Sequence, residues 1–416
     1  MTDADPGDEA EISRLVDRRM SLAREWEELV EQVRDLGPEF ADFLRPLPLE
    51  KLLPAADEGP VAIVNVSRRR CDALLVVKGE VRVCELPGLT AEKLERYVAE
   101  YLAILQTVSV RRGESAESSE LLDEAELHAE SALWRILLWL WEAVAQPVLT
   151  ALGFDRTPDE GEEWPRLWWC PTGLLTLLPL HAAGDHLVEG SDRPTVLDRV
   201  VSSYTPTLRA LVEARKQLAE DGPPPRMLVV TVPDAPGVPR LDLVGALGDR
   251  LGARFAGACT SLTGSDAITD RVRTELPRHR WVHLACHGDQ NLDDPSRGGL
   301  WLFDGLLTIA DVGAGHYQAE FAFLSACKTA TGGVALADEA ITLAAALHYT
   351  GFRHVIGTLW TVFEGAALRV ADAVYGDDPE ATFDPSRSAW LLHQALREMR
   401  ETERLTTWTP FTHIGP

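Results

Sequence analysis

Short apolar runs alternate with helical segments through the carboxyl half of the chain, and this alternation constrains the fold more than any other feature. The apolar runs lie at 227–232, 255–262, 281–286, 320–326 and 353–360, with helical patterns at 240–252, 266–277 and 335–349. Strands that alternate with helices pair in parallel, because each helix returns the chain across the face of the sheet. We therefore expect an α/β fold with a mostly parallel sheet flanked by helices.

The amino-terminal part follows other patterns. Residues 10–36 repeat apolar positions at helical spacing, and Lys78-Gly79 separates two β-rich runs as the turn of a hairpin does. Helical patterns follow at 90–108 and 120–153, and the apolar stretch 174–184 predicts a further strand. These patterns divide the chain into an acidic tail over 1–14, a helical and hairpin support part over 15–160, and an α/β part over 161–416.

Composition excludes several classes of function. The net charge is −25, which disfavours binding to nucleic acid or to anionic membranes because phosphates are repelled. The most apolar window, 133–154, contains Arg135 and Glu142 and predicts a core helix and no membrane span.

The amino-terminal sequence and the cysteines indicate where the protein works. The acidic start has no signal-peptide pattern, so we expect a cytoplasmic protein with reduced thiols. The six cysteines include no C-x-x-C pair, and no phosphate-binding or dinucleotide motif is present, so we expect no metal and no cofactor.

Two of the predicted strands stop at residues that carry chemistry. The run 281–286 ends at His287-Gly288, and the run 320–326 ends at Cys327. Functional groups of parallel sheets gather at the carboxyl ends of the strands, so this imidazole and this thiol should share one crevice. His287 would then act as base for the Cys327 nucleophile, and the backbone N–H groups of Gly288 and Cys327 would form an oxyanion hole.

Simpler interpretations of these residues stay open. A single histidine before glycine is usually a turn residue, and a single cysteine at a strand end is usually a small core residue. Cys286 should face the opposite side of its strand from His287 and belong to the core. A metal site from Cys286, His287 and Cys327 would lack a fourth ligand.

The flanks of both residues resemble a known family. HLACHG at 283–288, FLSACKTA at 323–330, RLWWCPTGLLTLLPLHAAG at 166–184 and WTPFTHIG at 408–415 are similar to the CHAT family of caspase-like peptidases, in the caspase–separase clan. The resemblance covers about residues 15–416. It implies a catalytic caspase-like domain over 161–416, with His287 as base and Cys327 as nucleophile, and a non-catalytic, caspase-like support before it.

The resemblance also implies a substrate pocket. In this clan the residue two positions before the nucleophile lines the pocket for the side chain that precedes the cleaved bond, and here that residue is Ser325. A neutral pocket favours an uncharged side chain, whereas Asp289, which follows the His-Gly pair, would make the pocket acidic if it turned inward.

The family also suggests a biological setting. We expect an endopeptidase that cleaves a partner protein in bacterial defence or signalling, controlled by an activating protein or a repeat-containing sensor in trans. Two alternatives remain: a catalytically silent interaction scaffold of the same fold, and a Cys–His acyl hydrolase of small molecules.

Overall fold

The computed structural model describes residues 6–37, 40, 43–111, 119–190, 192–216, 222–289, 294–325, 342–376, 378 and 382–416. The chain forms two compact units, Met1–Leu52 and Leu53–Pro416. The first unit contains helices α1 (Pro6–Arg34) and α2 (Leu49–Leu52), so α1 takes in much of the predicted acidic tail. The second unit contains every described strand.

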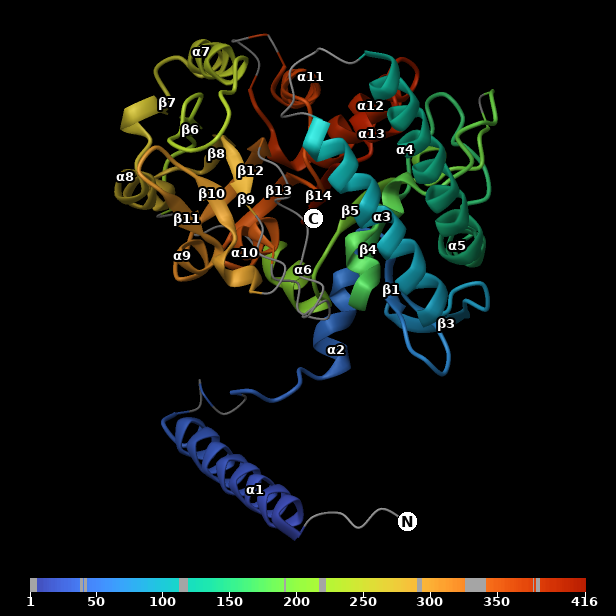
Figure 1. The fold of residues 1–416 in the computed structure, drawn as a ribbon, viewed down its shortest axis with the longest axis vertical. Helices are drawn as coiled ribbons and strands as arrows, with labels where there is room; N and C mark the ends of the chain where they lie inside the picture. The colour runs from blue at the N-terminus through green and yellow to red at the C-terminus, as the bar shows by residue number, and fades with distance from the viewer. Residues whose placement is uncertain are drawn as a thin grey trace. The chain divides into compact units, whose positions relative to one another are not determined.

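An 11-stranded sheet runs through the second unit (Figure 1). Its strands, in spatial order, are β3 (Glu80–Glu85), β2 (Asp72–Val77), β1 (Val61–Asn65), β4 (Arg166–Pro171), β5 (Val201–Tyr204), β14 (Phe411–Ile414), β13 (Phe352–Thr358), β12 (Ala319–Ser325), β8 (Trp281–Ala285), β6 (Met227–Thr231) and β7 (Cys259–Thr263). Strands from the predicted support part and from the predicted α/β part therefore belong to one sheet.

The strand directions divide this sheet into two blocks. Strands β1, β4, β5 and β14 are parallel to one another, and so are β13, β12, β8, β6 and β7. The blocks meet at the antiparallel pair β13–β14, and β2 and β3 add an antiparallel hairpin at one edge. The expected mostly parallel α/β sheet is confirmed, and it consists of two parallel halves that meet in opposite directions.

Helices cover both halves of the sheet. In Figure 1, α3, α4 and α5 lie over the half that holds β1, β4 and β5, and α7 to α10 surround the half that holds β6, β8 and β12. The helices of the second unit are α3 (Ala91–Arg111), α4 (Ser119–Leu140), α5 (Gln146–Leu152), α6 (Leu208–Ala214), α7 (Val244–Arg254), α8 (Thr269–Glu275), α9 (Ile309–Gly313), α10 (Leu343–Tyr349), α11 (Glu364–Tyr375), α12 (Ser388–Arg400) and α13 (Leu405–Trp408).

Both faces of the central strands are buried. In β6, Met227 and Val229 belong to one apolar cluster, whereas Leu228 and Val230 belong to another. This explains why these strands read as continuous apolar runs, since a parallel strand buried on both faces has no polar side.

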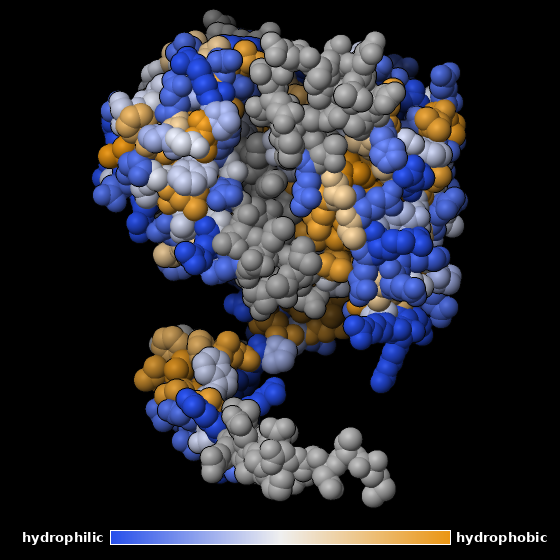
Figure 2. All heavy atoms as spheres, in the orientation of Figure 1, coloured by the Kyte–Doolittle hydropathy of each residue, from blue (hydrophilic) through white to orange (hydrophobic). Residues whose placement is uncertain are grey.

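One helical stretch, Glu126–Leu152, is long and apolar enough to cross a membrane by length and composition alone. It comprises the end of α4, a π-helical turn over Trp141–Ala145, and α5. Ile136, Leu137 and Val144 along this stretch are fully buried inside the protein core. This burial agrees with the predicted core helix, and Figure 2 shows hydrophilic residues over much of the visible outer surface of the second unit.

The predicted strand over 174–184 is wrong. The chain forms two short 3₁₀ helices there, Gly173–Leu177 and Leu180–Ala182. Gly173 adopts a φ of 57°, and Pro179 lacks the N–H that a strand would use. The leucines of this stretch are apolar because they are buried, and burial alone does not distinguish a strand from a tight helical turn.

Candidate active site

Two neighbouring strands bring the predicted base to one edge of the sheet. β8 and β12 pair in parallel with Ala285 opposite Ser325, so both strands end at the same level. His287 lies two residues beyond Ala285 and begins the short strand β9 (His287–Asp289). Cys327 follows Ser325 by two residues in the sequence but lies outside the described residues, so the pairing of His287 with Cys327 stays a prediction.

The imidazole of His287 is held by a backbone carbonyl. Its Nε2 lies 2.7 Å from the carbonyl oxygen of Pro239. A carbonyl oxygen only accepts hydrogen bonds, so Nε2 carries a proton and donates it to this contact. In the neutral ring Nδ1 is then the unprotonated nitrogen, which is the form that a general base requires.

The segment that carries Pro239 lies between β6 and α7. The Leu241 N–H donates to the carbonyl of Pro233 at 2.9 Å, and Arg240 pairs with Asp234 at 3.1 Å and with Asp242 at 3.2 Å. Side-chain patterns in the sequence cannot reveal Pro239, because only its backbone oxygen takes part.

A small second sheet contains β9, the strand that begins at the predicted base His287. β9 pairs with β10 (Gly299–Trp301), which pairs with β11 (Leu306–Thr308), and His287 lies opposite Trp301. Gly288, the predicted oxyanion donor, lies opposite Leu300 within the same pair. Leu302 and Gly305 close the turn between β10 and β11, since the Leu302 N–H donates to the Gly305 carbonyl at 2.8 Å, and Phe303 and Asp304 lie at the tip of this hairpin.

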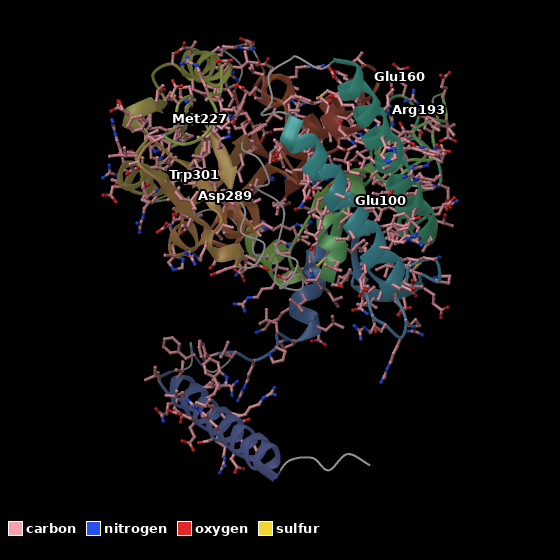
Figure 3. All side chains as sticks on the ribbon, in the orientation of Figure 1. Glu100, Glu160, Arg193, Met227, Asp289 and Trp301 are labelled. Carbon is pink, nitrogen blue, oxygen red and sulfur yellow. The ribbon has the colours of Figure 1, made fainter. Side chains whose placement is uncertain are left out.

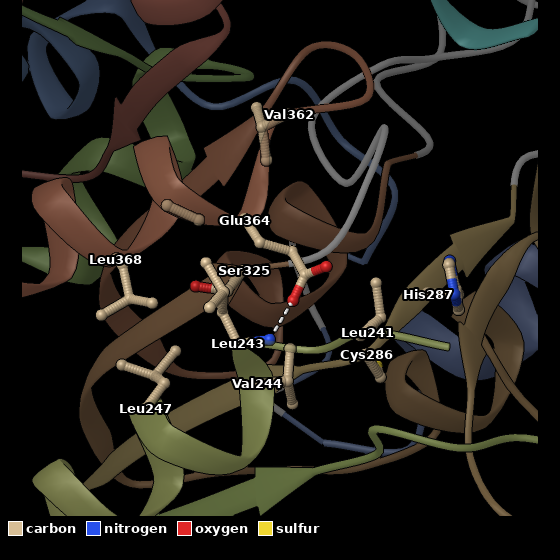
Figure 4. Close-up of a pocket in the computed structure, with 11 residues that line it drawn as sticks. Leu241, Leu243, Val244, Leu247, Cys286, His287, Ser325, Val362, Glu364 and Leu368 are labelled. Carbon is tan, nitrogen blue, oxygen red and sulfur yellow. Dashed lines mark hydrogen bonds between the residues drawn. The ribbon is translucent and has the colours of Figure 1, made fainter. Parts of the chain in front are cut away.

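A cavity opens beside His287 (Figure 4). Its described lining consists of Leu241, Leu243, Val244, Leu247, Cys286, His287, Ser325, Val362, Glu364, Ala367 and Leu368. Figure 4 shows His287 at one end of the cavity and the leucines Leu247 and Leu368 at the other. The walls are therefore largely apolar, and polar groups contact the cavity at only a few points.

Ser325 and Glu364 are two of these polar groups. The Ser325 hydroxyl oxygen is buried and has no hydrogen-bond partner among the described residues. The Glu364 carboxylate accepts hydrogen bonds from the backbone N–H groups of Leu243, at 2.7 Å, and Asp242, at 3.3 Å. No sequence pattern indicates Glu364, because its contact joins a region after β13 to a segment after β6.

Asp289, the other predicted pocket residue, lies elsewhere. It is exposed at the end of β9, where it pairs with Gly299, and it is not among the described residues that line the cavity. Figure 3 shows Asp289 close to Trp301 in the small sheet.

Two neighbours of the site belong to the core. Cys286 is 2% exposed and packs in the apolar cluster beneath the site. His283 is fully buried, and its Nδ1 lies 3.0 Å from the Tyr375 hydroxyl. Burial lowers the pKa of His283 to about 3, so this ring stays neutral at physiological pH. Within the described ranges, no three His, Cys, Asp or Glu residues are grouped so that they could hold a metal ion.

The chain matches a known protein family over most of its length. The model of the CHAT domain family matches residues 135–416, which is more than half of the chain. No curated protein matches the chain in sequence.

Solved structures show the same fold. Two separase–securin complexes of Saccharomyces cerevisiae are similar, with TM-scores of 0.62 and 0.59 at 8% and 9% identity. The matches cover 93% and 88% of this chain but only 32% and 30% of the separase chains. The Arg-specific cysteine proteinase gingipain R (RgpB) of Porphyromonas gingivalis matches with a TM-score of 0.40 at 11% identity, over 68% of this chain and 67% of its own. At 8% and 9% identity the likeness to separase shows the fold alone.

Proposed function

The chain belongs to the CHAT domain family, and from this we propose that it is a cysteine endopeptidase with a Cys327–His287 dyad. One observation carries the proposal. The His287 imidazole stands at the carboxyl end of the sheet with Nε2 bound to Pro239, so that Nδ1 is left to accept a proton. Cys327 follows the adjacent strand by two residues, a stretch that spans at most about 7 Å.

The proposed reaction proceeds in two stages. Nδ1 of His287 removes the thiol proton of Cys327, and the thiolate sulfur attacks the carbonyl carbon of the peptide bond. The N–H groups of Gly288 and Cys327 stabilise the oxyanion. The imidazolium protonates the leaving amine and a thioester remains. His287 then takes a proton from water, whose oxygen attacks the thioester and releases the acid and the free thiol.

The cavity is the proposed pocket for the side chain that precedes the cleaved bond. Its walls of Leu247, Leu368 and Val244 suit an apolar side chain, and the buried Ser325 hydroxyl, which has no partner in the described part of the chain, offers one hydrogen bond. The Glu364 carboxylate repels aspartate and glutamate. Since Glu364 already accepts two backbone hydrogen bonds, we expect leucine, methionine or a small residue at this position.

The proposed substrate is a protein, cleaved in the cytoplasm in a pathway of bacterial defence or signalling. The net charge of −25 disfavours nucleic acids and membranes as partners. The separase structures contain securin, a protein partner, and here we propose control by an activating protein or a repeat-containing sensor in trans.

A peptide library tests the activity and the specificity together. We expect cleavage after leucine or methionine, lost in Cys327→Ala. A silent scaffold would leave every peptide intact, and a small-molecule hydrolase would cleave activated esters but no peptide. Selection for arginine or lysine that disappears in Glu364→Gln or in Asp289→Ala would show that the pocket is acidic and that its assignment as neutral is wrong.

A further inference from the structure

We propose that Glu364 is a positioning residue for the catalytic base, which it reaches through the segment 239–243. The inference rests on the proposed function and deepens it. Glu364 begins α11, after β13, whereas the segment it contacts follows β6. The contact therefore joins the start of α11 to the segment between β6 and α7, and these two regions follow different strands.

The backbone of residues 239–243 links the hydrogen bonds of Glu364 to the hydrogen bond of His287. The Glu364 carboxylate holds the N–H groups of Leu243 and Asp242, and three residues before Asp242 the Pro239 carbonyl accepts the Nε2–H of His287. Leu243 is the N-cap residue, one position before α7 begins at Val244, and its own side chain makes no capping hydrogen bond. The Glu364 carboxylate supplies the hydrogen-bond acceptor that the start of α7 lacks. Its negative charge is also favourable there, because the N-terminus of a helix carries partial positive charge.

The other side-chain tethers of the segment are weak. The Arg240 side chain is 65% exposed, and its partners Asp234 and Asp242 are 58% and 81% exposed. Ion pairs this open to water contribute little. The half-buried carboxylate of Glu364 is thus the strongest described side-chain contact that fixes where the Pro239 carbonyl lies, and with it the orientation of His287.

Steady-state kinetics of the full chain on the selected peptide tests this role. Glu364→Ala should lower kcat by about 10- to 100-fold with KM nearly unchanged, because a small displacement of a catalytic group has an effect of this size. Glu364→Gln retains one carbonyl acceptor and should recover part of the loss. The matched control is Asp372→Asn, which removes the contact of α11 with Arg250 of α7 away from the cavity and should leave kcat unchanged.

Each other outcome is decisive. A fully active Glu364→Ala, or a change only in KM that depends on the side chain before the cut, would overturn the positioning role. A fall in melting temperature with kcat intact would overturn it too. If the unaltered chain cleaves no peptide at all, the proposed function fails first, which separates the two failures.

Discussion

At the scale of single residues, the site depends on which nitrogen of His287 carries the proton. The contact with Pro239 places the proton of the neutral ring on Nε2. Nδ1 is therefore unprotonated and can accept a proton. A histidine that lost this contact would divide between two tautomers, and only one of them has an unprotonated Nδ1. The backbone carbonyl thus takes the place that a carboxylate holds in other triads.

Substitution of the base should lower activity far more than stability. His287→Ala is expected to reduce kcat/KM on a cleaved peptide by at least about 10²-fold, the usual contribution of a general base. Because the ring is only half-buried and makes one hydrogen bond among the described residues, the melting temperature should change little. Peptide cleavage and thermal unfolding of the same preparation measure both.

The neighbouring thiol is the control for this substitution. Cys286→Ala should keep most of the activity, because Cys286 packs in the apolar cluster and lines only part of the cavity. An inactive Cys286 variant that is folded and stable would mean that the wrong cysteine has been assigned as nucleophile.

At the scale of elements, the small sheet β9–β10–β11 determines where the base stands. Gly299 in β10 lies opposite Asp289 of β9 and Thr308 of β11. A Cβ added to Gly299 would lie 2.0 Å from the Leu307 carbonyl oxygen, which is much closer than any real contact. The close pairing of these strands therefore requires glycine at this position.

Gly299→Ala should separate β10 from β11 and displace β9 with His287. We expect a loss of kcat of about 10²-fold, since catalytic geometry tolerates little displacement. Gly252→Ala is the matched control, because a Cβ there lies 3.8 Å from its nearest neighbour and alanine favours the helix α7. Kinetics on both variants measures the effect. Equal activity of the two would show that the small sheet does not position the base.

The strands of the site could be predicted from the sequence, but the contacts around them could not. β8 and β12 are recognisable because each apolar run stops abruptly at a polar residue, and their parallel pairing follows from the alternation with helices. Glu364 and Pro239 were missed because they meet the site through loops after β13 and β6. Those loops come together only in the strand order β6-β8-β12-β13, which local patterns do not contain.

At the scale of the whole molecule, the two parallel blocks share one core and bury many imidazoles. Burial lowers the pKa of His181 to about 4, and it lowers the pKa values of His283, His354 and His393 to about 3, from an ordinary value of 6.5. The His354 and His413 rings lie next to each other across the antiparallel pair β13–β14. The seam between the two blocks therefore holds neutral rings that cannot be protonated without loss of packing.

Stability should therefore fall as the pH is lowered from 6.5 toward 4. Between these values the unfolded chain binds protons at the histidines and the folded chain does not, so acid favours unfolding. Each such histidine contributes about 1.4 kcal/mol per pH unit to the free energy of unfolding. Urea unfolding at pH 7.5, 6.5 and 5.5 measures the trend, and a midpoint that stays constant or rises at pH 5.5 would contradict it.

The most direct test of the central claim is covalent labelling of the folded, unaltered chain with a peptidyl electrophile that carries leucine at the position before the reactive carbon. After digestion, mass spectrometry identifies the modified cysteine. We expect one adduct, on Cys327, which forms much more slowly in His287→Ala and at an unchanged rate in Cys286→Ala. An adduct on another cysteine, or labelling of Cys327 at the same rate without His287, would contradict the dyad.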